Sequence, residues 1–169
     1  MIRRHRKTLK LVERFIPKHS QIYDLGKENP MSKIMNNDGY FVSNNTNEVD
    51  FNKCQKEIIK LSKAHKYTTS FEVFEHILNL YAVLNAIKSD YMLCTVPLKV
   101  FFSNAYWGKD KHDQHYHEFE QRQFLWILEE TGWEVIEKGT WTFTDKIGLR
   151  PIFRLFFPSY IYVYLKRKQ

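Results

Sequence analysis

Apolar residues recur along the chain at two alternating spacings, which predict helices and strands in turn. Near the start, Leu9, Val12 and Ile16 fall on one helical face, and Pro17 then ends the helix. Short apolar, aromatic or β-branched runs, typical of strands, follow at 22–25, 39–45, 66–74, 90–98, 133–143 and 159–167. Helical spacing occurs between these runs at 31–35, 51–61, 80–87 and 124–128.

This alternation predicts one α/β domain that spans residues 1–169. Strands separated by helices favour a mostly parallel sheet with helices covering both of its faces. The last two strands have no helix between them, so we expect an antiparallel strand pair at the C-terminus. The expected architecture is a three-layer sandwich built on a Rossmann-like sheet.

Composition narrows the class of protein. A chain of 169 residues with 43% hydrophobic content can bury a core without metal or disulfide support. Cys54 and Cys94 lie far apart and form no CxxC pattern, which argues against a zinc finger or a disulfide scaffold. Glu13 and Arg14 interrupt the N-terminal segment, and no apolar run of membrane-spanning length follows. We therefore expect a cytoplasmic protein with no membrane span.

The net charge of +7 and the isoelectric point near 9.3 favour an anionic partner. The basic residues, however, cluster at the two ends of the chain, at 3–7 and 166–168, rather than in one patch. Solvated termini explain this distribution most simply. We therefore do not expect nucleic acid as the partner, although the charge does not exclude it, and a small anionic molecule stays open.

The stretch at the end of the first predicted strand, "DLGKENP", is a candidate ligand-binding turn. In open α/β sheets, ligands bind beyond the carboxyl ends of the strands, and Asp24, Leu25 and Gly26 occupy such an end. Gly26 allows a ligand to approach the backbone closely. Pro30 has no amide hydrogen and restrains Asn29 to an extended conformation.

The stretch "FEVFEHI" carries the densest candidate chemistry. Glu72, Glu75 and His76 follow the middle predicted strand. The period-2 alternation of a strand would send the two glutamates to opposite faces, so they converge only if the backbone leaves the strand directly after Phe71. The pKa of a histidine near neutrality suits His76 to act as a general base, and a structural role for it is also open.

Four short motifs in this order, "IYDLG", "SFEVFEHILN", "CTVPL" and "HYHEFEQRQFLWILEETGWEVI", resemble the class I S-adenosylmethionine-dependent methyltransferases. The similarity covers nearly the whole chain and is greatest to small-molecule members of types 11 and 23. That family commonly has Asp-x-Gly-x-Gly-x-Gly at the first turn, whereas this chain keeps only Gly26 of the three glycines.

The resemblance implies S-adenosylmethionine as cofactor and transfer of its methyl group to an oxygen, nitrogen or carbon of a small acceptor, and an anionic acceptor is one option. It implies that Glu75 and His76 are the catalytic candidates. The implied cofactor contacts are Asp24, Leu25, Gly26, Lys27, Asn45, Asp50, Ser70, Phe71 and Glu72. Asn44 or Asn45 would replace the acidic residue that receives the ribose hydroxyls. Asp50 could instead cap a helix that begins at Phe51.

Two alternatives remain open. Glu-x-x-Glu-His also resembles the divalent-metal motif of the small-RNA 3'-terminal 2'-O-methyltransferases, in which a metal lowers the pKa of the attacking hydroxyl. The corresponding ligands here are Glu72, Glu75, His76, His115 and His117. We expect these side chains to line the acceptor side of the site without forming a high-affinity metal site. The missing glycines leave a cofactor-free interaction domain on the same fold as the second alternative.

Overall fold

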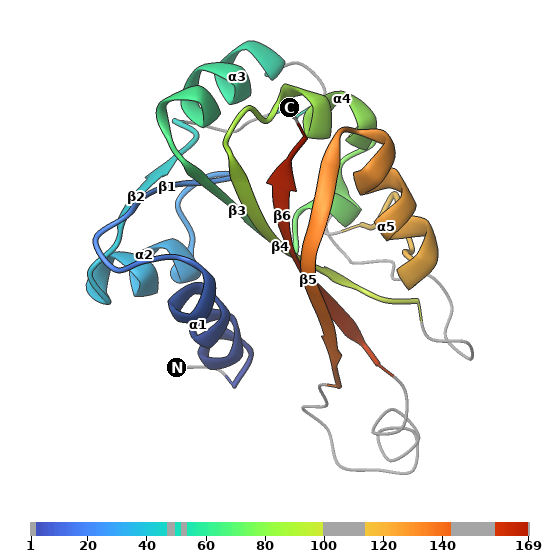
Figure 1. Ribbon diagram of the computed structural model, residues 1–169, viewed down its shortest axis with the longest axis horizontal. Helices are drawn as coiled ribbons and strands as arrows, with labels where there is room; N and C mark the ends of the chain where they lie inside the picture. The colour runs from blue at the N-terminus through green and yellow to red at the C-terminus, as the bar shows by residue number, and fades with distance from the viewer. Residues whose placement is uncertain (1–2, 47–49, 52–53, 100–113, 143–157, 169) are drawn as a thin grey trace.

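The computed structural model describes residues 3–46, 50–51, 54–99, 114–142 and 158–168, and it shows a six-stranded mixed sheet with helices on both faces (Figure 1). The strands lie in the order β2-β1-β3-β4-β6-β5. Their bounds are β1 Gln21–Asp24, β2 Phe41–Asn44, β3 Tyr67–Phe71, β4 Tyr91–Pro97, β5 Trp133–Trp141 and β6 Tyr160–Arg167. The helices are α1 Arg3–Phe15, α2 Pro30–Asn37, α3 Gln55–Ala64, α4 Leu80–Ala86 and α5 Gln121–Glu130, with a 3-10 turn, η1, at Phe74–His76. The predicted α/β sandwich is confirmed.

The first four strands are parallel, and their carboxyl ends lie at one edge of the sheet. Asp24, the last residue of β1, is level with Asn44 in β2 and Thr69 in β3. Phe71, the last residue of β3, is level with Thr95 in β4. Polar residues from all four strands therefore meet at this edge, where ligands bind in open α/β sheets.

Strand β6 lies between β4 and β5 and is antiparallel to both, so the predicted antiparallel strand pair is also confirmed. Because β6 runs opposite to β4, its first residue, Tyr160, pairs with Pro97 at the carboxyl end of β4. Tyr160 also pairs with Trp141, the last residue of β5. The start of β6 thus adds an aromatic side chain to the same edge.

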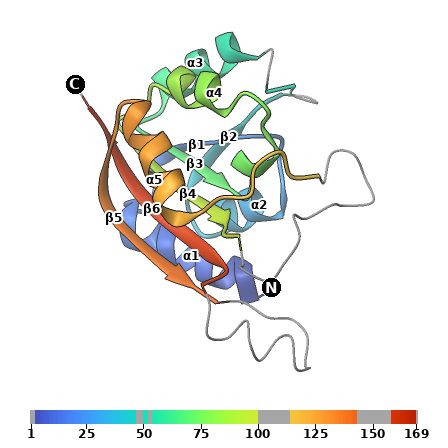
Figure 2. The ribbon, with the colours of Figure 1, turned by 90° about the vertical axis from the view of Figure 1, so that its right-hand side faces the viewer.

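Helices α1 and α2 cover one face of the sheet, as Figures 1 and 2 show. Val12 of α1 and Met35 of α2 are fully buried there against Ile22 and Leu93 of the strands. Helix α1 ends at Phe15 because Pro17 follows and cannot continue the helical hydrogen bonds. The apolar face that predicted this helix is the face that the helix buries against the sheet.

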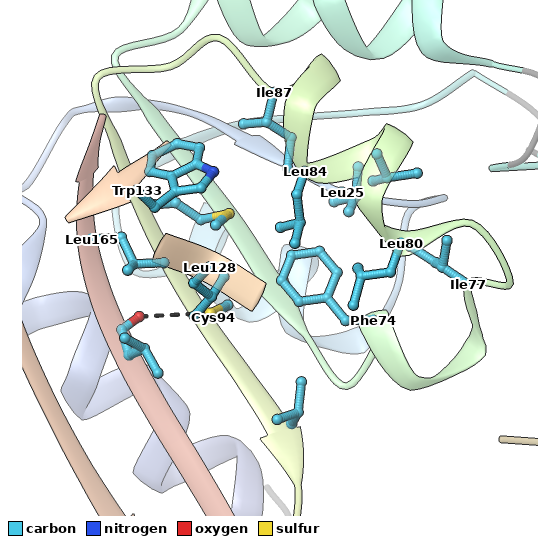
Figure 3. Packing of buried hydrophobic residues seen from close by; sticks show 14 of the residues in the cluster. Leu25, Phe74, Ile77, Leu80, Leu84, Ile87, Cys94, Leu128, Trp133 and Leu165 are labelled. Atoms are coloured by element: carbon cyan, nitrogen blue, oxygen red, sulfur yellow. Dashed lines mark hydrogen bonds between the residues drawn. The ribbon is translucent and has the colours of Figure 1, made fainter. Parts of the chain in front are cut away.

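Helices α3, α4 and α5 cover the opposite face over a larger core (Figure 3). Phe74, Leu128 and Trp133 are fully buried in it. Cys94 also lies there, with its Sγ 3.8 Å from the Val163 carbonyl oxygen, to which it donates, and burial raises the pKa of its thiol. Cys94 is therefore a core residue, and its sulfur keeps its proton and stays an unreactive thiol.

Two boundaries differ from the sequence prediction. The run at 66–74 forms a strand only as far as Phe71, because the chain turns sharply at Glu72. The helix expected to begin at Phe51 begins at Gln55, with Cys54 as its N-cap residue, so Asp50 does not cap it. None of the helices among the described residues is long and apolar enough to cross a membrane.

Candidate functional site

Asp24 ends β1 with a buried carboxyl group that accepts hydrogen bonds from four side chains. Its Oδ1 accepts from Thr69 Oγ1 at 2.7 Å, and its Oδ2 accepts from Ser32 Oγ at 2.8 Å, Asn29 Nδ2 at 3.0 Å and Asn44 Nδ2 at 3.2 Å. Burial raises the pKa of Asp24, while the four hydrogen bonds oppose that rise. The donors belong to β3, α2, the turn and β2, so one carboxyl group joins these elements.

The turn at Gly26 is attached to the end of β2 by Asn45. The Gly26 N–H donates to Asn45 Oδ1 at 3.0 Å, and the Gly26 carbonyl accepts from the Asn45 N–H at 2.9 Å. Gly26 has a φ of +114°, a conformation that residues with a Cβ rarely adopt. An added Cβ would lie at an ordinary contact distance, 3.8 Å, from Phe51 Cζ. The backbone conformation, and not a lack of space, therefore requires the glycine.

The segment without glycines is the start of α2, and Asn29 is its N-cap. Asn29 is extended, as Pro30 predicts, and its Oδ1 accepts from the amides of Met31 at 2.8 Å and Ser32 at 3.1 Å. Ser32 Oγ in turn accepts from the Asn29 N–H at 3.3 Å, which completes a capping box. Side-chain hydrogen bonds, rather than glycines, determine the path of this loop.

Two buried polar atoms near the turn, Asn45 Nδ2 and Ser70 Oγ, have no hydrogen-bond partner among the described residues. Because the Gly26 N–H can only donate, Asn45 must direct Oδ1 toward it, which identifies Nδ2 as the atom that lacks an acceptor. Buried polar groups are normally paired, and leaving one unpaired costs about 1–3 kcal/mol. Both atoms therefore fit a ligand that carries polar groups.

Four other predicted cofactor residues are either core residues or exposed residues. Leu25 is a core residue with 1% exposure, and its N–H donates to the Thr69 carbonyl. Phe71 packs with the core between the sheet and α1. Lys27 and Asp50 are exposed. The side chains of Leu25 and Phe71 therefore pack in the two cores, and the sequence could not distinguish these core side chains from pocket side chains.

The two glutamates of "FEVFEHI" lie near each other because the chain leaves β3 directly after Phe71. The sequence predicted that they could converge only under this condition. Glu72 has a φ of +58°, which costs about 1–2 kcal/mol for a residue with a Cβ, and η1 follows at Phe74–His76. Glu72 Oε1 accepts from Thr95 Oγ1 at 2.9 Å, and Oε2 lies 4.0 Å from Arg4 Nη1 of α1. Strained residues of this kind concentrate at functional sites.

Burial changes the protonation of both glutamates. It raises the pKa of Glu72 to about 7, although the Thr95 hydrogen bond and the Arg4 charge oppose this rise. Glu75 has 1% exposure, and its pKa is raised well above the usual value, first by burial and then by the charge of Glu72. Its Oε2 has no hydrogen-bond partner among the described residues. The pair thus holds a proton near neutral pH.

His76 and His115 lie beside Glu75. His76 Nδ1 is 3.0 Å from the Gln114 carbonyl oxygen, and because a carbonyl only accepts, Nδ1 is the donor. In the neutral ring, Nε2 is then the nitrogen that can take a proton, and it lies 3.8 Å from Glu75 Oε1. The His115 ring meets the His76 ring edge-on, with 4.9 Å between centroids.

Three of the five predicted metal ligands come together. Glu75, His76 and His115 can each offer a ligand atom, and these atoms lie within 4.8 Å of one another. His117 is held elsewhere, since its Nε2 lies 2.8 Å from the Ile77 carbonyl oxygen. A carboxylate and two imidazoles suit Mn²⁺ or Fe²⁺ chemically. A carboxyl group must lose its proton to bind a metal ion, however, and the raised pKa of Glu75 opposes this loss. We therefore still predict that these residues form no high-affinity metal site.

Sequence reasoning missed several residues of the site. The capping role of Asn29 had a signal, namely a serine three residues later, at Ser32. Thr69 and Thr95 had a weaker signal, as polar residues inside apolar strands. Arg4 had none, because only the packing of α1 on the sheet brings it to Glu72.

A family model described as a methyltransferase domain matches residues 2–138 of the chain. The chain belongs to this methyltransferase family. No curated protein matches the chain in sequence.

Solved structures of S-adenosylmethionine-dependent methyltransferases share the fold of this chain. One, provisionally assigned to that class from Listeria monocytogenes, has 9% identity and a TM-score of 0.66, over 98% of this chain and 99% of that one. The Burkholderia thailandensis 1,6-didemethyltoxoflavin N1-methyltransferase has 10% identity and a TM-score of 0.67, over 98% and 78%. The Haemonchus contortus phosphoethanolamine N-methyltransferase 2 has 13% identity and a TM-score of 0.61, over 97% and 53%. The class I methyltransferase fold is thereby confirmed.

Replacing Asp24 with Asn should destabilise this methyltransferase. The substitution keeps the shape of the side chain but turns one acceptor oxygen into an amide that faces the Asn29, Ser32 and Asn44 donors. We expect a loss of about 2–3 kcal/mol in the free energy of unfolding, measured with urea. Thr140→Ser, on the exposed side of β5, is the control, with an expected change within about 0.5 kcal/mol. An unchanged stability for Asp24→Asn would show that the carboxyl group does not hold these elements together.

The raised pKa of Glu72 predicts a pH-dependent stability. The folded state binds the proton more tightly than the unfolded state, so this contribution is present below about pH 4.5 and is lost as pH rises to about 7. Over this range the free energy of unfolding of the wild type, relative to Glu72→Gln, should fall by about 2–3 kcal/mol. Urea unfolding of both proteins across this pH range measures the fall in relative stability, with Glu137→Gln on β5 as the control carboxyl variant. A relative stability that rises with pH would contradict the assignment.

Proposed function

We propose that this protein transfers the methyl group of S-adenosylmethionine to a small-molecule acceptor at the carboxyl ends of β1, β3 and β4. The observation that carries the proposal is the turn at Gly26 in a chain of the methyltransferase family. The unpartnered atoms of Asn45 and Ser70 support it, since both are buried at the edge of the sheet where the cofactor would lie. The Burkholderia and Haemonchus structures both contain S-adenosylhomocysteine, which supports the same cofactor here.

The residues present fit such a cofactor through a small number of contacts. The backbone at Gly26 permits close approach, and Asn45 Nδ2 and Ser70 Oγ would pair with its polar groups. Asp24 would act indirectly, because its carboxyl group is occupied by four donors. S-adenosylmethionine has no phosphate, so it needs no cradle of glycine amides. When bound, it supplies a methyl group on a positively charged sulfur.

The acceptor side of the site would be formed by Glu72, Glu75 and His76. His76 is held by Gln114 so that Nε2 is the nitrogen able to take a proton from an acceptor. Glu72 and Glu75 would contact and orient the acceptor near the strand ends. Positioning of the nucleophile supplies most of the rate enhancement in such a transfer.

Calorimetric titration with S-adenosylmethionine and with S-adenosylhomocysteine tests the cofactor. We expect at least one of them to bind more tightly than millimolar, a limit that corresponds to about 4 kcal/mol. Gly26→Val should abolish binding, because a β-branched residue disfavours the φ of +114°. If neither ligand binds at millimolar concentration, the cofactor-free interaction domain is the better reading.

A second variant separates loss of binding from loss of folding. Ser70→Ala removes a hydroxyl group that has no protein partner among the described residues, so the fold should be kept while cofactor affinity falls about fivefold to tenfold. Thr140→Ser serves as the control, with unchanged affinity. Near-ultraviolet circular dichroism reports whether each variant is folded. Full affinity in both Gly26→Val and Ser70→Ala would place the ligand elsewhere.

A nucleic-acid acceptor is the competing function, and the convergence of Glu75, His76 and His115 is the observation that favours a metal-dependent form of it. We expect short single-stranded and duplex RNA to bind weakly or not at all, because the basic residues cluster at the two chain ends rather than in one patch, and Arg4 of the N-terminal cluster lies beside the acidic Glu72. Fluorescence anisotropy across 50–300 mM salt, roughly the range in which phosphate contacts are lost, measures this. Tight binding with a steep salt slope would favour the RNA enzyme.

A further inference from the structure

Among the described residues, no lysine or arginine lies closer than 4.0 Å to the carboxyl groups of Glu72 and Glu75, and His76 Nε2 lies 3.8 Å from Glu75 Oε1. The Glu75 side chain is buried, with 1% exposure, and the Glu72 side chain is partly buried, with 17%. Among the described residues, Arg4 is the only lysine or arginine that pairs with either, and its Nη1 lies at 4.0 Å, the outer limit of an ion pair. The Arg4 side chain is itself 40% exposed, so water competes for it. Buried carboxylates are normally paired much more closely.

Two further observations indicate a ligand at this place. Glu75 Oε2 is buried and has no hydrogen-bond partner among the described residues. Burial raises the pKa of the hydroxyl group of Tyr160, at the start of β6, and the charges of Glu72 and Glu75 raise it further. The two acids and Tyr160 come from different elements, so the fold itself assembles this electronegative site.

We propose that Glu72 and Glu75 bind an amine that enters as its ammonium ion, which makes an amine the acceptor class of this protein. An ammonium nitrogen has no lone pair, so one of its protons would pass to the Glu72 carboxylate before the neutral nitrogen could accept the methyl group. The negative charge that the two acids share attracts an ammonium ion, and one of its N–H donors matches Glu75 Oε2, which has no hydrogen-bond partner among the described residues. A neutral hydroxyl acceptor would leave the charge uncompensated, and an anionic acceptor would be repelled.

The position of Arg4 agrees with this assignment. Arg4 approaches Glu72 from α1, outside the sheet, at a distance that leaves the carboxyl group weakly paired. An incoming ammonium group would replace Arg4 as the partner of Glu72. The net charge of +7, which favoured an anionic partner, is carried mainly by the ends of the chain, whereas the buried titratable groups at this place are acidic.

The inference rests on the proposed methyl transfer but is tested separately from it. The probes are benzylamine and ethylamine, each compared with its matched alcohol, benzyl alcohol and ethanol, by calorimetry at pH 7.5 with and without saturating S-adenosylhomocysteine. We expect at least one amine to bind at least tenfold more tightly than its alcohol. Glu72→Gln and Glu75→Gln should each reduce amine affinity tenfold or more. Arg4→Met should increase it several-fold, because a competing cation is removed.

The matched control is Glu137→Gln, which removes a carboxyl group that also pairs with an arginine, Arg14, but lies on β5 away from the site. It should leave amine affinity unchanged. Thermal denaturation separates a binding role from a structural one. Replacing an under-compensated buried charge with a neutral isostere should keep or raise the melting temperature, whereas acids that hold the fold together would lower it when replaced.

The possible failures are distinguishable. If S-adenosylhomocysteine does not bind but an amine does, the proposed function is wrong and the ammonium site stands. If S-adenosylhomocysteine binds and neither amine exceeds its alcohol, only the ammonium assignment is overturned. Addition of MnCl₂ or MgCl₂ alone tests whether the site binds a divalent metal ion instead of an ammonium ion. Stoichiometric metal binding that Glu75→Gln removes, and that excludes the amines, would overturn the proposal in favour of a metal site.

Discussion

The buried carboxyl group of Asp24 makes the hydrogen bonds on which the geometry at the carboxyl ends of the parallel strands depends. It accepts from β3 through Thr69, from β2 through Asn44, and from the start of α2 through Asn29 and Ser32. These donors are satisfied only when three strands and one helix have their native positions together. The turn at Gly26 is thereby held in place although the chain lacks the further glycines that its family commonly has there.

The sharp end of β3 is the second constraint. Glu72 adopts a left-handed backbone conformation, and the Thr95 hydroxyl and backbone carbonyl hold it there through the Glu72 carboxyl group and N–H. The turn brings Glu75 and His76 back toward the strand ends, at a cost in strain and in desolvated charge. A core residue would not need this arrangement, and neutral side chains would stabilise it more. We therefore interpret the strained acidic turn as a feature of function rather than of stability.

The family and the fold leave the reaction open, because related folds support many activities. The chemistry of the site narrows the choice of reaction. Near the turn, the buried atoms that lack a partner among the described residues are an amide nitrogen and a hydroxyl oxygen, and the proposed cofactor would offer its uncharged, hydroxylated nucleoside part to them. Near η1, the unpaired atom belongs to a carboxyl group beside a second one. The two parts of the edge thus have different chemistry, as a site for two different ligands requires.

The sequence by itself determined the order of helices and strands, the mixed sheet, the family and the two stretches that carry the chemistry. These features follow from local periodicity and from motifs, each contained in a few neighbouring residues. Only the tertiary structure decided which side chains face the site. Leu25 and Phe71 stand in the motifs but point into cores, while Arg4 stands far from the motifs in sequence and lies 4.0 Å from Glu72. The physical reason is that side-chain direction at a sheet edge depends on strand register, on where each strand ends and on which helix covers it, and these are set by contacts between residues distant in the chain.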